Sequence, residues 1–202
     1  RLDDMSVGVA LLLCDNTGEA RVLANELDAL NQTRKEIEQG MQAEAVTLCE
    51  KLERSSETLP GGLAMYHPQW HQGVVGILAS RIKERFHRPV IAFAPTGDGT
   101  LKGSGRSIQG LHMRDALERL DTLHPGLMIK FGGHAMAAGL SLEEAKFDEF
   151  QRLFGELVTE WIDPALLQGE VVSDGELSPA EMTMDVAQML RDAGPWGQMF
   201  PE

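Results

Sequence analysis

The sequence predicts an α/β protein built on a mixed sheet with flanking helices, preceded by a long linking helix. Three observations predict this class. Short apolar segments alternate with amphipathic ones between residues 60 and 163, as in strands followed by helices. Residues 19–56 contain no proline and keep one apolar stripe. No apolar run approaches the roughly 20 residues of a membrane-spanning helix, and 43% of the 202 residues are hydrophobic, which suffices for a buried core.

The first part of the chain is predicted to be helical. Residues 6–13 form a short apolar helix that ends in a turn at Asp15–Gly18. In residues 19–56, apolar side chains recur at steps of three and four, which places them on one face of a helix of roughly 55 Å. A helix of this length in a modest chain typically bridges two domains or lies against one.

The middle part is predicted to hold the sheet. Pro60-Gly61-Gly62 ends the long helix. Strands are predicted over 63–67, 89–93, 101–107 and 139–142, helices over 74–86, 112–120 and 143–162, and turns at 96–99 and at Gly132-Gly133.

The character of the chain changes again at Pro164. Residues 171–177 read as a strand, and Ser178-Pro179 reads as the capped start of a helix that runs to Asp192. Some forty residues are too few for a domain, so we expect this segment to open a further one. The predicted organisation is therefore 1–59 as the end of one domain with the linking helix, 60–163 as a binding domain, and 164–202 as the start of a third.

The charge is unevenly distributed. The chain carries a net charge of −13, yet residues 60–140 carry +4 and the remainder −17. All six histidines and 13 of the 21 glycines fall in the same middle segment. This pattern permits an anionic ligand at one site, with acidic flanks that suppress indiscriminate binding; an α/β core with ordinary surface charge explains it equally well. Two cysteines in helix-like sequence fit a reducing, cytoplasmic setting.

Three motifs are candidates for binding chemistry. In GGHAMAAG (132–139), small residues surround His134, so that an imidazole and main-chain amides can meet a phosphate. In GSGRS (103–107), hydroxyls and a guanidinium can bond to phosphate oxygens, although by itself a strand end with one surface arginine is the simpler interpretation. In HPQWHQGVVG (67–76), a helix begins after Trp70, which we interpret as a core residue rather than a base-stacking one.

Together with HQGVVGILASRIKERFHRPVI (71–91), these motifs resemble the DHHA1 region of the DHH phosphoesterase superfamily. Within it, the order and spacing are most similar to the bacterial RecJ family of single-stranded-DNA-specific 5′→3′ exonucleases. Residues 1–4 resemble the end of a motif before the family's linking helix, and residues 195–202 resemble the start of its oligonucleotide-binding (OB) fold.

The resemblance implies a division of labour. In the family, two divalent metals, Mn²⁺ or Mg²⁺, lie in an N-terminal DHH domain and activate water against a phosphodiester. No Asp-His-His motif occurs in this chain, so no catalytic or metal-binding residue is expected in it. The residues implied to contact single-stranded DNA are Ser104, Arg106, Ser107, Gly132, Gly133, His134 and Arg1, with His134 near the scissile bond. Single-stranded-DNA-binding protein and other repair proteins are further candidate partners.

Two other functions remain open. A DHH-family phosphodiesterase of short oligonucleotides or cyclic dinucleotides would share the same motifs, but the long helix and the OB-like tail disfavour it. A non-enzymatic assembly module would use the acidic helix and the tail to dock on proteins.

Overall fold

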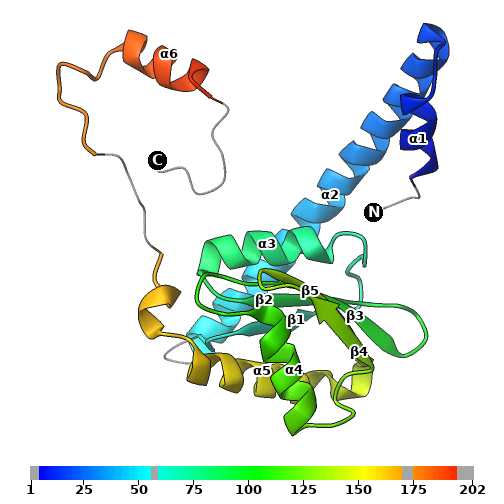
Figure 1. Ribbon diagram of the computed structural model, residues 1–202, viewed down its shortest axis with the longest axis vertical. Coiled ribbons are helices and arrows are strands. Elements are labelled where there is room, and N and C mark those ends of the chain that lie inside the picture. Colours follow the sequence, from blue (N-terminus) through cyan, green and yellow to red (C-terminus); the bar gives the residue numbers. More distant parts are fainter. Residues whose placement is uncertain (1–4, 56–58, 170–174, 195–202) are drawn as a thin grey trace. The chain divides into compact units, whose positions relative to one another are not determined.

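The structure is a computed structural model that describes residues 5–55, 59–169 and 175–194. The chain divides into two compact units, Arg1–Gln168 and Gly169–Glu202. The first unit contains a five-stranded sheet in the order β1-β2-β3-β5-β4 (Figure 1). β1 and β2 are parallel and every other pair is antiparallel, so the predicted α/β class with a mixed sheet is confirmed.

The strands are β1 (Leu63–Tyr66), β2 (Val90–Pro95), β3 (Thr100–Arg106), β4 (Lys130–Gly133) and β5 (Ala137–Glu143). The α-helices are α1 (Ser6–Leu12), α2 (Thr17–Ser55), α3 (Val75–Phe86), α4 (Met113–Leu123), α5 (Phe147–Trp161) and α6 (Met184–Asp192). Two 3₁₀ turns, η1 (Glu144–Lys146) and η2 (Pro164–Leu167), flank α5.

The sheet separates two apolar cores because successive strand residues point to opposite faces. On one face, Ile91 and Phe93 of β2 pack with α4 and α5, where Phe150 and Phe154 stack with ring centroids 5.9 Å apart. On the other face, Val90 and Ala92 of β2 pack with α3 and with one end of α2. Helix α3 contacts β2 and β3, so on this face β5 and β4 lie beyond the helix (Figure 1).

The linking helix α2 is continuous, as predicted, and only part of it is buried. Its Met41, Ala45 and Cys49 enter the second core at steps of four residues, which is the spacing of one helix face. Glu44 on the same helix accepts a hydrogen bond from the Trp70 indole at 2.9 Å. This bond and the buried stripe fix the end of α2 against the sheet domain.

Three predictions about secondary structure were wrong. Gly132-Gly133 is the end of strand β4, not a turn; residues 134–136 make the turn, because glycines in the strand still pair with β5 through their backbone. α6 starts at Met184 and is capped by Thr183, because Ser178 instead donates to Glu181 within a turn. Residues 175–177 are not a strand, and 171–174 lie outside the described residues.

Within the described ranges, no helix has the length and apolar character needed to cross a bilayer.

Candidate nucleic-acid interface

The face of the sheet beyond α3 is an open surface with a floor of small residues. The strand register aligns side chains in rows, since directly paired residues share a face. One row joins Ser104 of β3, Gly139 of β5 and Gly132 of β4. No side chain rises from the two glycines in this row, so a ligand can approach the backbone of both strands. We call the exposed face of β3, β5 and β4 the open face.

Arg106 lies at the edge of the open face beside the start of α3. Its Nη1 donates to the Ser104 hydroxyl at 3.1 Å and to the Gly105 carbonyl at 2.8 Å. A Cβ added at Gly76, in the first turn of α3, would lie 3.0 Å from Arg106 Nη2 and 3.1 Å from Ser104 Oγ. The glycine therefore gives the guanidinium room, and a half-buried cation and hydroxyl come together at a helix N-terminus, where anions are favoured.

Gly76 was not among the predicted site residues. Its signal in the sequence is a glycine in the first turn of a predicted helix, at a position where alanine would support the helix better. Sequence patterns alone do not connect that glycine to an arginine thirty residues later.

His134 lies at the same end of the open face. It is exposed, and its backbone N–H donates to the Ala137 carbonyl at 2.8 Å. Ala137 pairs directly with Arg106 across β5 and β3. The structure therefore brings two predicted phosphate contacts, Arg106 and His134, to one end of one surface, although they are 28 positions apart in the chain.

Gly133 has a structural role. Its φ is +147°, and a Cβ there would lie 2.5 Å from the Ala137 carbonyl oxygen. Only glycine fits this position, because the β4–β5 backbones approach so closely. At Gly132, by contrast, an added Cβ meets nothing within 4 Å.

Ser107 differs from the prediction. It is 1% exposed, and its hydroxyl donates to the Leu111 carbonyl at 2.7 Å. Its backbone N–H donates to the Met136 carbonyl at 3.0 Å. As folded here, the hydroxyl is not available to a phosphate and instead holds the loop between β3 and α4. The last predicted contact, Arg1, lies outside the described residues.

Trp70 is a core residue, as we interpreted it, being 3% exposed. Beside it, His71 accepts a hydrogen bond from the Gly73 N–H through Nδ1 at 3.1 Å. These groups shape the loop that leads into α3 and so position Gly76 against Arg106.

The charge of the open face changes along its strands. Lys102 and Lys130 are exposed in the middle of β3 and at the start of β4. At the far end, the turn before β3 contains Asp98, where hydrogen bonds from the Thr100 and Thr96 hydroxyls and from the Thr100 N–H lower the pKa of its carboxyl to about 2. Asp98 is therefore ionised at neutral pH, and this end of the face is anionic.

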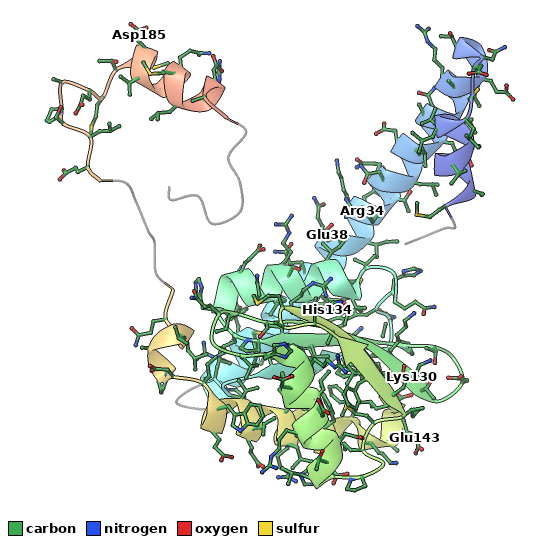
Figure 2. All side chains as sticks on the ribbon, in the orientation of Figure 1. Arg34, Glu38, Lys130, His134, Glu143 and Asp185 are labelled. Carbon is green, nitrogen blue, oxygen red and sulfur yellow. The ribbon has the colours of Figure 1, made fainter. Side chains whose placement is uncertain are left out.

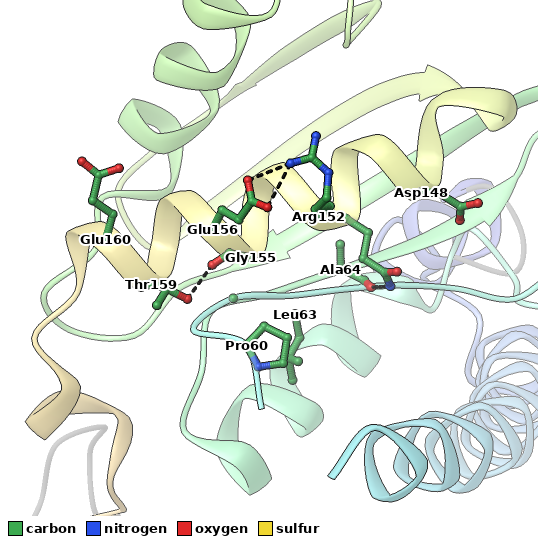
Figure 3. Close-up of a pocket in the computed structure, with 11 residues that line it drawn as sticks. Pro60, Leu63, Ala64, Asp148, Arg152, Gly155, Glu156, Thr159 and Glu160 are labelled. Atoms are coloured by element: carbon green, nitrogen blue, oxygen red, sulfur yellow. Dashed lines mark hydrogen bonds and ion pairs between the residues drawn. The ribbon is translucent and has the colours of Figure 1, made fainter. Parts of the chain in front are cut away.

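A pocket of about 600 Å³ lies away from the open face, between β1 and α5 (Figure 3). In it, Arg152 donates two hydrogen bonds to the Glu156 carboxylate, and Thr159 donates to the Gly155 carbonyl. The charge of Arg152 in this pocket is therefore already balanced by Glu156. The pocket contains none of the predicted phosphate contacts.

The described residues do not fit a metal centre. Over 5–55, 59–169 and 175–194, no three His, Cys, Asp or Glu side chains come together in a group that could hold a metal ion.

The chain is similar to proteins of a known family. Residues 60–160 match the DHHA1 domain. Over all 202 residues the chain is 90% identical to a protein of Escherichia coli named single-stranded-DNA-specific exonuclease RecJ. A crystal structure of RecJ from Thermus thermophilus in complex with Mg²⁺ aligns with 97% of the chain at 30% identity and a TM-score of 0.72. A crystal structure of exonuclease RecJ bound to manganese aligns with 80% at 31% identity and a TM-score of 0.64.

The chain spans only part of these proteins. It covers 35% of the length of the E. coli relative, and 29% and 38% of the two crystallised chains.

Proposed function

The chain belongs to the DHHA1 domain family, and from this premise we propose that it is the strand-gripping region of a RecJ-type, single-stranded-DNA-specific 5′→3′ exonuclease acting in DNA repair and recombination. In this proposal, two Mn²⁺ or Mg²⁺ ions bound by a DHH domain outside this chain supply the hydrolytic chemistry. In this proposal the protein is cytoplasmic, and its partners are single-stranded DNA and single-stranded-DNA-binding protein or other repair proteins.

One observation supports the proposal above the others. Arg106 is hydrogen bonded to Ser104, and the backbone of His134 is bonded to Ala137, the strand partner of Arg106, at the same end of a sheet face whose floor is formed by Gly132 and Gly139. A flat glycine floor admits the sugar–phosphate backbone of one strand. The guanidinium can take two phosphate oxygens at once, and the neighbouring hydroxyl and imidazole add further donors.

The contacts are sequence-independent by their chemistry. Phosphate oxygens are the same at every nucleotide, so groups that bind them position a strand without reading its bases. This is the behaviour that an exonuclease needs as it moves along a strand.

The test is Arg106→Ala in the full-length protein that contains this chain. We expect at least a tenfold loss of exonuclease activity on single-stranded DNA, because a charge-assisted, bidentate contact to phosphate is worth more than about 1.4 kcal/mol. Arg119→Ala, which removes an exposed arginine from α4, is the matched control and keeps wild-type activity. Wild-type activity of Arg106→Ala would overturn the proposal.

The phosphodiesterase alternative shares the same site but needs no long strand. Comparing the degradation of long strands with that of dinucleotides separates the two, since an enzyme of short substrates prefers the dinucleotide. An assembly module would show no binding of single-stranded DNA that depends on Arg106.

A further inference from the structure

A pair of lysines lies on the open face away from Arg106. The register places Lys102 of β3, Ser141 of β5 and Lys130 of β4 in one row. The row with Ser104, Gly139 and Gly132 separates it from the row of Arg106. Because a strand rises about 3.4 Å per residue, the lysine row lies about 14 Å from Arg106 along the sheet.

The lysine row lines a shallow pocket of about 290 Å³, which also includes Gly132 and Gly139. The two lysines are two strands apart, or about 10 Å at the backbone. Their flexible stems allow both ammonium groups to reach one anion held over Ser141, whose half-buried hydroxyl lies between them.

No acidic side chain of the described residues neutralises the two lysines. In the described part of the chain, no ion pair includes Lys102 or Lys130, whereas Arg34, Arg81, Arg85, Lys146, Arg152 and Arg191 all pair with Asp or Glu. In a protein of net charge −13, two exposed cations outside these ion pairs, on a glycine-floored face, create a local attraction for anions.

The stripe of positive charge has a definite end. The next row pairs Thr100 with Glu143, whose carboxylate lies 3.7 Å from Lys146 Nζ, so the negative charge at this end comes mainly from the ionised Asp98 in the turn before β3. Figure 2 shows His134 at one end of the β4–β5 hairpin and Lys130 with Glu143 at the other. A polyanion lying on this face is attracted from Arg106 to the lysine row and repelled beyond it.

We propose that Lys102 and Lys130, with Ser141, form a second phosphate subsite, so that the DNA backbone runs along β3 from Arg106 and His134 to the lysine row and leaves the sheet before Glu143. The subsite rests on the proposed function. It adds the path of the bound DNA along β3 and the point at which the DNA leaves the sheet.

The test is the double variant Lys102→Gln/Lys130→Gln in the full-length protein, with binding of a labelled oligothymidylate measured by fluorescence anisotropy in EDTA at several salt concentrations. Each phosphate contact to a single strand contributes about 0.7 to the slope of log affinity against log salt, and the subsite holds one phosphate. We therefore expect the slope to fall by about 0.7 and the affinity at low salt to fall at least tenfold. Thermal melts matching the wild type show that the variant folds.

Lys35→Gln/Arg119→Gln is the matched control. It removes two exposed positive charges from α2 and α4, outside the open face, and we expect both slope and affinity to stay at wild-type values. If the lysine variant behaves like this control while Arg106→Gln weakens binding, the second subsite is wrong and the proposed function stands. If Arg106→Gln also binds as the wild type does, the proposed function itself fails.

Discussion

Glycines on and around the open face have two different roles. The atoms that an added Cβ would meet show which role each glycine has. A Cβ at Gly103 would lie 2.5 Å from the ring of Phe93, so this glycine allows two layers to pack. A Cβ at Gly76 would instead meet the ends of the Arg106 and Ser104 side chains, at 3.0 Å and 3.1 Å. Flexible side-chain ends can move where a packed ring cannot. Gly103 is therefore required by the fold, and Gly76 by the position of the guanidinium.

Gly76→Ala tests this distinction at the scale of one residue. Alanine supports the first turn of α3 better than glycine by up to about 1 kcal/mol, which offsets the displacement of Arg106, so we expect the free energy of unfolding to change by less than about 1 kcal/mol. Affinity for single-stranded DNA should fall severalfold, as seen by anisotropy. Gly40→Ala in α2, where an added Cβ meets nothing within 4 Å, is the control and should leave affinity unchanged. Wild-type affinity of Gly76→Ala would show that Arg106 does not depend on this space.

At the scale of elements, two adjacent glycines of the β4–β5 hairpin have different roles, one in the floor of the open face and one in the close approach of the two strands. A Cβ added at Gly132 meets nothing within 4 Å, whereas Gly133 adopts a positive φ against the backbone of Ala137 and Ala138. Neighbouring positions of one strand point to opposite faces, so the same residue type has unrelated roles in them.

Replacing each glycine of this hairpin by alanine should give opposite results. Gly133→Ala should lower the free energy of unfolding by about 2–4 kcal/mol, because it combines backbone strain with a steric clash. Gly132→Ala should leave stability nearly unchanged and weaken DNA binding, because its methyl group rises from the floor. Chemical denaturation and anisotropy titrations measure the two effects. Equal losses of stability in both variants would contradict these separate roles.

Most elements of the sheet domain were predictable because their apolar residues follow the period of a strand or a helix. The buried strand at 90–95 and helix α3 are examples. Strand β4 was missed because its sequence, KFGG, has low strand propensity and is held by pairing with β5. The motifs identified Arg106 and His134, but their convergence depends on register, and the burial of Ser107 depends on tertiary packing.

At the scale of the whole molecule, we propose that this region contributes binding groups, and among its described residues no group of side chains could hold a metal ion. The predicted contacts are a guanidinium, a hydroxyl, an imidazole and backbone glycines, and none of them needs a metal to bind a phosphate. The acidic remainder of the chain, at −17, disfavours indiscriminate attraction of nucleic acid, whereas Lys102, Arg106 and Lys130 give the open face positive charge. In the proposed function, strand binding and hydrolysis are therefore separable properties of the longer protein.

Removal of metal tests this separation. In the full-length protein, we expect EDTA to abolish hydrolysis of single-stranded DNA while leaving its affinity within about threefold, because the described residues of this chain hold no group of metal ligands. Arg106→Ala should still weaken binding in EDTA, by about tenfold, since a charge-assisted contact to phosphate does not involve the metal. Anisotropy with and without EDTA, for wild type and variant, gives all four values. If chelation alone reduced affinity as much as the substitution does, the open face would depend on the metal centre, and gripping would not be separable from cutting.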